Sequence, residues 1–299
     1  MKKVLSLICF AFIGVLLLTG CKKEENEPGL EVKIAGMSDN DSKALFNSED
    51  YLSLIFEDGD VMRVNGAPYT LRYENGKWIA RGASGYMTNS EHDTLLGNKF
   101  YCFYGQSPAT ASPTFPNPSY GSVSFVNSGS QDGSYTVYKP GFVMAGATSD
   151  STLTLYPAFA VIRVYNQYSS ITLNSFQVGF GNNAGVKTCG SITPTSSYPT
   201  IGSPTYLTGV SHTVVHHPVF GDMNNYEGEF LKSTMAQSPN ISSKYKHYVI
   251  VPLASNSVTT DLYFKFNESY GGSSTDIYKK VSNFTLQRGR VYTFDINDL

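Results

Sequence analysis

The sequence has few charged residues, few cysteines, and no segment whose apolar residues recur at the spacing of an α-helix. Only 15% of its 299 residues are charged, and the formal net charge is -2. A nucleic-acid-binding protein needs a basic face, so the composition argues against that class of partner. None of the 4 cysteines and 5 histidines falls into the spacing of a zinc site. The missing helical period predicts a chain built of β-strands.

The first twenty residues have the composition of an export signal. Two lysines precede an apolar run at residues 4–18, which is too short for a membrane-spanning helix. The run closes with the pattern Leu-Thr-Gly-Cys of a lipobox, where a signal peptidase cuts before the cysteine and the thiol receives lipid. An ordinary signal peptide followed by a chance cysteine is the alternative. The pattern predicts a lipoprotein signal peptide at residues 1–20 and lipidation of Cys21.

Residues 21–29 cannot contribute to a hydrophobic core, because charged and polar residues lead into Pro28 and Gly29. We expect a flexible tether between the lipid and the first strand. A charged run behind the lipidated cysteine also resembles the surface-export signal of some Gram-negative lipoproteins, with a plain linker as the alternative. Removing residues 1–20 takes away two lysines and no acidic residue, so the formal charge moves from -2 to -4.

Two cysteines remain once Cys9 leaves with the signal and Cys21 carries the lipid. Cys102 and Cys189 could form a disulfide in an oxidising compartment. They lie far apart in the sequence and in different predicted domains, so the sequence favours two separate buried thiols.

Aromatic and turn-forming residues are abundant, with 21 Tyr, 18 Phe and 27 Gly. These residues suit half-buried strands that are separated by turns. The dipeptides Asn65-Gly66 and Asn75-Gly76 lie between alternating runs and predict two-residue hairpins. Strands are predicted wherever apolar residues alternate or form a dense short run, as they do at residues 30–34, 51–56, 61–64, 69–73, 78–81, 100–104, 122–126, 135–143, 152–155, 158–165, 171–180, 248–253, 259–266, 277–281, 284–286 and 290–296.

The predicted strands fall into two groups. Residues 146–151 have the composition of a linker, and residues 188–240 are rich in Ser, Pro, Gly and Asn, which predicts long loops with short strands. Short strands with turns about ten residues apart are typical of β-sandwiches. We therefore predict an N-terminal β-sandwich domain at residues 30–147 and a C-terminal β-sandwich domain at residues 148–299.

Three stretches resemble the fimbrillin family, the subunits of type V pili (fimbriae) and their relatives. The first runs from a Phe-x-x-Gly-Asp turn at residues 56–60, through a hairpin ending in Trp78, to the aromatic strand at 100–104. The second is the apolar strand at 153–164, and in the third Gly289 precedes a Tyr-bearing strand. The resemblance implies an all-β fold of two tandem transthyretin-like (Greek-key type) β-sandwich domains, and export as a lipoprotein of the outer membrane and cell surface.

The resemblance also implies assembly by β-strand addition. In fimbrillins a protease cuts after an arginine behind the first strand. The strand then leaves, and a partner's strand fills the groove. Here no arginine lies between Cys21 and Met62, so Lys43 is the candidate proteolytic processing site, with Lys33 as the other lysine beyond the tether. A donor strand of roughly 8–10 residues does not follow Ile296. We therefore expect a pilus anchor, tip or accessory subunit, or an adhesin, rather than a shaft subunit.

Catalytic and metal-binding signatures are weak. His212 and His216 share a face of a strand while His217 points away, and no carboxylate flanks them before Asp222, so no metal site is expected. The acidic residues between 39 and 60 lack the spacing of a calcium loop. No Gly-x-Ser-x-Gly elbow and no marked carboxylate pair is present. The sequence predicts a protein that is not an enzyme and needs no cofactor.

The expected partners are other pilus subunits, the outer membrane through the lipid anchor, and a host or bacterial surface glycan or protein. A carbohydrate-binding surface lipoprotein that captures glycans is the alternative function. That function would display three exposed aromatic side chains on one loop face. A secreted hydrolase on a β scaffold is a third hypothesis, and it would need two carboxylates converging in a cleft.

Overall fold

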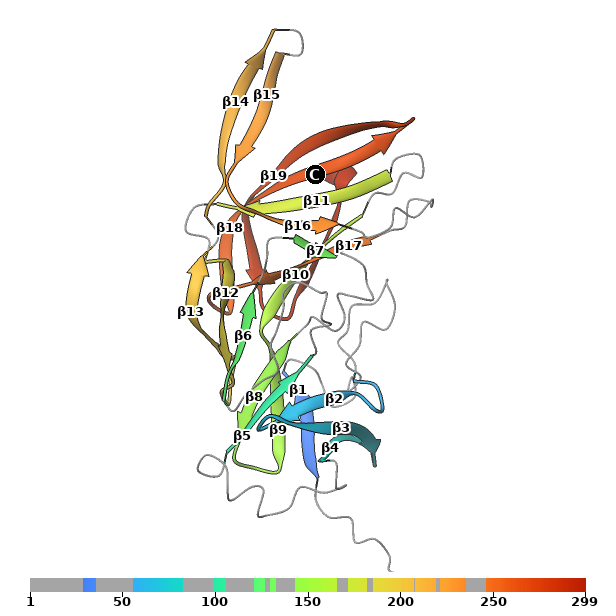
Figure 1. Cartoon of the computed structure of the whole chain (residues 1–299), viewed down its shortest axis with the longest axis vertical. Helices are drawn as coiled ribbons and strands as arrows, with labels where there is room; N and C mark the ends of the chain where they lie inside the picture. Colours follow the sequence, from blue (N-terminus) through green and yellow to red (C-terminus); the bar gives the residue numbers. More distant parts are fainter. Residues whose placement is uncertain are drawn as a thin grey trace, which may run out of the picture.

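The described part of the molecule is built of β-strands. The computed structural model describes residues 29–35, 56–82, 99–105, 121–126, 130–132, 143–165, 172–181, 185–206, 208–218, 221–234 and 246–299 (Figure 1). Apart from a short 3-10 helix at Ile296–Asp298, all regular secondary structure in these residues is β-strand. The predicted all-β class is therefore confirmed. None of these residues forms a helix of the length and apolar character that crossing a membrane requires.

One end of the molecule is a closed sheet in the order β1-β4-β3-β2-β5-β8-β9 (Figure 1). Its neighbouring strands are antiparallel, except that β1 and β9 run parallel and so close the ring. Both predicted Asn-Gly turns have positive φ at each residue, as a type I′ turn requires. The strands are β1 (Leu30–Ile34), β2 (Val61–Val64), β3 (Ala67–Glu74), β4 (Lys77–Gly82), β5 (Phe100–Tyr104), β8 (Met144–Thr148) and β9 (Thr152–Pro157).

The prediction of a linker at residues 146–151 is wrong. Gly146 lies in β8, where it pairs with Cys102, and the chain then turns directly into β9. The glycine is needed for close approach of two strands, because a Cβ at position 146 would lie 2.2 Å from the carbonyl oxygen of Thr154. The β8–β9 hairpin therefore belongs to the same closed sheet as β1, and the predicted boundary after residue 147 falls inside β8.

The other strands form four open sheets, in the orders β17-β10-β20, β19-β18-β11-β16-β7, β13-β12-β6 and β14-β15. Residues 188–240, for which long loops with short strands are predicted, contain strands of five to seven residues over most of their described part. The bounds are β6 (Val123–Val126), β7 (Ser130–Asp132), β10 (Phe159–Tyr165), β11 (Thr172–Phe180), β12 (Lys187–Thr193), β13 (Thr200–Tyr206), β14 (Ser211–His217), β15 (Gly221–Glu227), β16 (Phe230–Thr234), β17 (Lys246–Pro252), β18 (Ser257–Tyr270), β19 (Ser273–Gln287) and β20 (Val291–Asp295).

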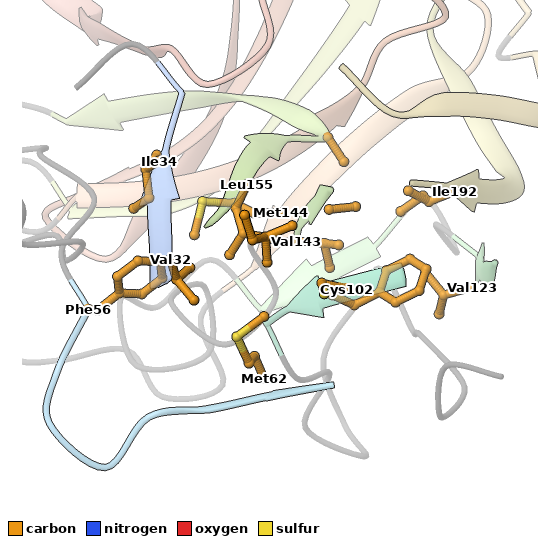
Figure 2. Close-up of a cluster of buried hydrophobic side chains, with 14 of the residues drawn as sticks. Val32, Ile34, Phe56, Met62, Cys102, Val123, Val143, Met144, Leu155 and Ile192 are labelled. Atoms are coloured by element: carbon orange, nitrogen blue, oxygen red, sulfur yellow. The ribbon is translucent and has the colours of Figure 1, made fainter. Parts of the chain in front are cut away.

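The sheet β17-β10-β20 is shared by two hydrophobic clusters. Successive side chains of a strand point to opposite faces, and β10 and β17 are buried on both faces. One face packs into the cluster of the closed sheet, part of which Figure 2 shows. Its contributors are Phe159, Val161, Tyr248 and Ile250. The opposite face packs into the second cluster through Ala160, Ile162, Val164, Val249 and Val251. The two cores are thus joined through a common sheet.

Arg288 fastens the strand ends beside this shared sheet. Its guanidinium is 5% exposed and donates to the carbonyl oxygens of Pro199 at 2.6 Å, Leu253 at 2.9 Å and Ala254 at 3.3 Å. Burial lowers the pKa of Arg288 to about 10. The next residue also contributes, since the Gly289 amide donates to the carbonyl oxygen of Phe159 at 2.8 Å. The loop before β13, the end of β17 and the start of β10 are therefore tied together.

The two remaining cysteines are separate thiols, as the sequence favours. Cys102 is fully buried and Cys189 is half-buried, and both are free. Burial also raises the pKa of the Cys102 thiol, which suppresses the reactive thiolate. We predict that a thiol reagent modifies Cys189 in the native protein and reaches Cys102 only after denaturation. Peptide mass spectrometry after brief labelling checks this, and native labelling of both cysteines at equal rates would contradict it.

Candidate assembly site

The first strand closes the sheet from a position between β4 and β9. Its Leu30 lies opposite Ala80 of β4, and its Ile34 lies beside Leu155 of β9. Backbone bonds at both ends extend the parallel pairing, from the Glu31 amide to the Ser151 oxygen at 2.8 Å and from the Ala35 amide to the Leu155 oxygen at 2.9 Å. Both edges of β1 are therefore hydrogen-bonded.

Three apolar side chains hold β1 in the closed sheet. Leu30, Val32 and Ile34 are 2%, 3% and 9% exposed and belong to its core cluster. Figure 2 shows Val32 and Ile34 projecting from β1 into this cluster, with Phe56 beside them. Full burial of each such side chain stabilises by about 1.5–3 kcal/mol. Loss of β1 would expose this apolar surface together with the backbone edges of β4 and β9.

The outward face of β1 carries an ion pair. The Lys77 Nζ of β4 donates to the Glu31 carboxylate at 2.7 Å, and the Lys33 Nζ lies 3.4 Å from its other oxygen. The Glu31 side chain is 17% exposed. The hydrogen bond from Lys77 lowers the pKa of Glu31 below its ordinary value, with further contributions from the charges of Lys77 and Lys33.

Because of this ion pair, we expect the contribution of Glu31 to the stability of the folded chain to depend on pH. Glu31 has a depressed pKa in the folded chain, so its stabilisation is present above its ordinary pKa and is lost as the pH falls through the lowered value. We expect Glu31→Gln to destabilise the protein by up to about 1 kcal/mol at pH 7 and by less at pH 2. Urea denaturation at both pH values measures the difference. Lys77→Met should reproduce the pattern, and an equal loss from Glu31→Gln at both pH values would contradict it.

A second surface is the hairpin of β14 and β15, here called the arm. Within the described residues its two strands pair only with each other, and the arm projects from the end of the molecule opposite the closed sheet (Figure 1). Isolated two-stranded hairpins are marginally stable in water. The exposed strand edges and the exposed side chain of Val214, at 57%, make the arm a candidate contact surface.

The base of the arm is anchored by aromatic packing. Tyr226 makes edge-to-face contacts with Tyr263 of β18 and Tyr278 of β19, at ring-centroid distances of 5.1 and 5.4 Å. Val210 packs with them, and its amide donates to the Phe180 oxygen at 2.7 Å. A buried aromatic pair contributes about 0.5–1.5 kcal/mol beyond the area it buries. The arm is therefore fixed at its base to the long β18–β19 hairpin.

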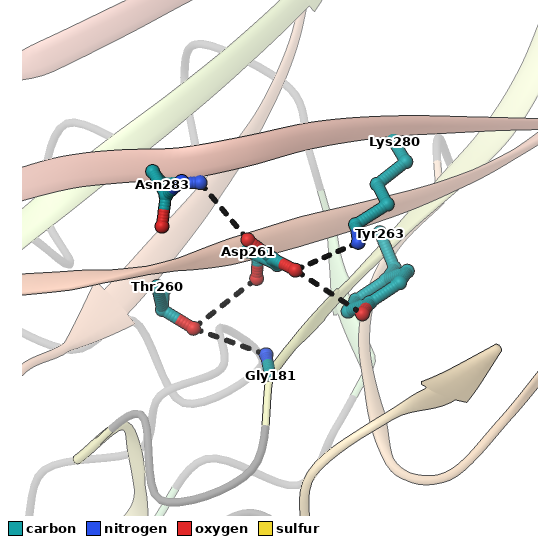
Figure 3. A network of polar contacts seen from close by, with 6 residues as sticks. All are labelled: Gly181, Thr260, Asp261, Tyr263, Lys280 and Asn283. Atoms are coloured by element: carbon teal, nitrogen blue, oxygen red, sulfur yellow. Dashed lines mark hydrogen bonds and ion pairs between the residues drawn. The ribbon is translucent and has the colours of Figure 1, made fainter.

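A polar network supports Tyr263 where this hairpin has a β-bulge (Figure 3). The Asp261 carboxylate accepts from the Lys280 Nζ at 2.8 Å, the Asn283 amide at 2.9 Å and the Tyr263 hydroxyl at 3.5 Å. The hydrogen bond from Lys280 lowers the pKa of Asp261. The Lys280 Nζ also lies 5.2 Å from the centre of the Tyr263 ring. The network therefore holds Tyr263, on which Tyr226 of the arm packs.

The residues predicted from the sequence fall in different places. Cys21 and Lys43 lie outside the described residues, so both sites stay predictions. His212 lies in the arm, with its Nε2 2.8 Å from the Asn224 Oδ1. The backbones at His216 and His217 pair with positions 222 and 221 of β15. In the described part of the chain, no three His, Cys, Asp or Glu residues gather as a metal site would require.

The described tyrosines with the most exposed side chains belong to different sheets. Tyr73 lies in the closed sheet, Tyr206 in β13 and Tyr270 at the end of β18, with exposures of 52%, 54% and 69%. The glycan-capture hypothesis calls for three exposed aromatic side chains gathered on one face. These three tyrosines come from separate sheets and give that hypothesis no shared platform.

No protein-family model matches the sequence, and no curated protein matches it. Three solved structures, all of candidate adhesion proteins from Bacteroides, show a low similarity to it. They are a cell adhesion protein from Bacteroides fragilis (10% identity over 89% of this chain and 92% of that chain, TM-score 0.30), an adhesin from Bacteroides ovatus (10%, 93% and 95%, 0.29) and a cell adhesion protein from Bacteroides eggerthii (15%, 92% and 90%, 0.29). Similarity this low supports no conclusion about this chain, so its function must be argued from its own geometry.

Proposed function

We propose that this chain is a non-catalytic, fimbrillin-like lipoprotein of the outer membrane and cell surface. It acts as an anchor, tip or accessory subunit of a pilus (fimbrium), or as an adhesin, and it assembles through β-strand addition. The position of β1 carries the proposal. This strand follows the tether directly, and three apolar side chains and two strand edges hold it in an otherwise complete sheet. A groove left by such a strand fits a strand from another chain.

The incoming strand has a defined chemistry. It needs apolar side chains at alternate positions to replace Leu30, Val32 and Ile34, and a backbone able to bond to both β4 and β9. Since the tether leads into β1, cleavage at Lys43 would separate the body from its lipid. A copy that keeps β1 stays anchored, which favours the anchor or accessory role over the shaft.

The arm supports an adhesive or assembly contact. The closed sheet that contains β1 and the arm lie at opposite ends of the molecule (Figure 1). If lipid is attached at Cys21, the arm faces away from the membrane, where pilus subunits or a host or bacterial surface glycan or protein can meet it. The proposal includes the two tandem transthyretin-like β-sandwich domains that the family resemblance implies, and it requires no cofactor.

The anchor is tested by replacing Cys21. We expect Cys21→Ala to move the protein from the outer-membrane fraction to the soluble fraction and to abolish its labelling on intact cells. Cys9→Ala, a matched change inside the signal, should leave both unchanged. Retention of Cys21→Ala in the membrane with normal surface labelling would refute the lipid anchor.

Strand addition is tested through Trp78, the single tryptophan of the chain, which lies opposite Val32. A chain that begins at residue 36 should bind a synthetic peptide of residues 29–35, with a change in Trp78 fluorescence. The same peptide carrying Val32→Asp should bind at least about 100-fold more weakly, because its carboxylate would be buried without a partner. Equal binding of both peptides would refute the groove.

A further inference from the structure

The parallel pairing of β1 with β9 determines how tension acts on the hydrogen bonds between the two strands. β1 is entered at Leu30 from the tether, while β9 leaves its sheet at Pro157 and continues almost at once into β10. Because the two strands are parallel, the tether and β10 leave the pair at opposite ends. Both strands also run along the long axis of the molecule (Figure 1).

We propose that β1 and β9 form a shear clamp that holds the body to its anchor when the arm end is pulled away from the membrane. The proposal rests on the proposed function, because tension enters through the tether only if Cys21 is anchored. Its physical basis is the direction of force on the hydrogen bonds. Tension draws β1 and β9 in opposite directions along their own axes, so the bonds between them must yield together instead of one after another.

The bonds and side chains of β1 suit this role. The register runs from Glu31 beside Thr152 to Ile34 beside Leu155, and two further backbone bonds extend it at both ends. Sliding of β1 along its axis would also drag its three buried apolar side chains out of the core of the closed sheet. On the other edge, β1 is bonded to β4 and paired through Glu31 with Lys77. Sliding therefore breaks backbone bonds, apolar contacts and an ion pair in one step.

The next link along the chain is built in a similar way. β10 pairs along its whole length with β17, from Phe159 opposite Pro252 to Tyr165 opposite Lys246. It also runs parallel to β20 and is buried on both faces. The Gly289 amide holds the carbonyl oxygen of Phe159 at the point where the force enters. Tension that passes β1 and β9 therefore reaches a strand with two bonded edges.

Single-molecule force spectroscopy tests the clamp by pulling on different ends of β1. The full chain with Cys21 as its first residue carries one handle on Cys21 and one on the arm through Pro218→Cys, with Cys189→Ser to remove the half-buried thiol. The matched variant carries Cys21→Ser and Ala35→Cys, so that the same strand is pulled from its other end and peels. Release of β1 from its N-terminal side frees at least residues 30–35 and lengthens the chain between the handles by roughly 20 Å or more, which marks the step.

We expect release of β1 to need about twofold more force, or more, with the handle on Cys21 than with the handle on Ala35→Cys, because the unfolding barrier is higher in shear. Release at an equal or lower force from Cys21 would overturn the clamp. These readings are independent of lipidation and fibre assembly, so a failed clamp and a failed proposed function remain distinguishable.

Discussion

Replacing Phe159 with alanine is expected to lower the free energy of unfolding by about 3–5 kcal/mol. The Phe159 side chain is fully buried, and its ring packs edge-to-face on Phe125 at 5.3 Å in the cluster of the closed sheet. Ile162→Ala removes a fully buried side chain from the opposite face of the same strand, in the second cluster, and is expected to cost about 2–5 kcal/mol.

Both substitutions should shift one common unfolding transition, because the sheet that carries Phe159 and Ile162 is part of both cores. Calorimetry and urea denaturation followed by circular dichroism measure this. Val214→Ala, at an exposed position of the arm, is the control and should change stability by less than about 0.5 kcal/mol. Two separate transitions, each shifted by one substitution only, would show that the cores unfold independently.

Val32→Asp is expected to have the next largest effect, a loss of about 3–5 kcal/mol at pH 7. Val32 is 3% exposed between Trp78 and Leu153 in the closed sheet, and a carboxylate there would be buried without a partner. Protonation removes the charge, so the loss should be smaller at pH 4. Because the buried carboxylate would lie in β1, we expect β1 to be released before the rest of the chain unfolds.

Hydrogen exchange measures this release directly. The amides of Glu31 and Ala35, which donate to the carbonyl oxygens of Ser151 and Leu155, should lose protection in Val32→Asp while the amides of β10 keep theirs. Lys33→Asp places the same charge on the next residue of β1, where the side chain is 46% exposed, and should cost less than about 1 kcal/mol. Equal losses from Val32→Asp and Lys33→Asp would show that β1 is not held by its inward face.

Local patterns in the sequence predicted several strands well. The predicted strands at residues 30–34, 61–64 and 100–104 coincide with β1, β2 and β5, because alternation and Asn-Gly turns act over a few residues. For residues 188–240 the prediction of long loops with short strands was right about the short strands, but it gave neither their bounds nor their partners. The Ser, Pro, Gly and Asn content of this region is typical of loops, and β12 to β16 form there because each strand finds a partner along the chain or across a sheet.

The pairing of strands that are distant in the chain could not be predicted from the sequence. Nothing local to β1 indicates that its neighbours are β4 and β9, which are brought beside it only by closure of the whole sheet. The pairing of the arm was not predicted either: the sequence places His212 and His216 on one face of a strand but gives that strand no partner. Gly221 and the Thr-Val content of β14 are the signals that could have indicated a hairpin there.

The hydrogen bonds of Arg288 beside the shared sheet are insensitive to acid. Its acceptors at Pro199, Leu253 and Ala254 are neutral carbonyl oxygens, which do not change charge on acidification. The guanidinium itself stays protonated at every pH below its lowered pKa of about 10. The proposed position at a cell surface would expose the chain to the acidity of its surroundings. Ion pairs such as that of Glu31 weaken under those conditions, while this fastening keeps its charge and all its partners.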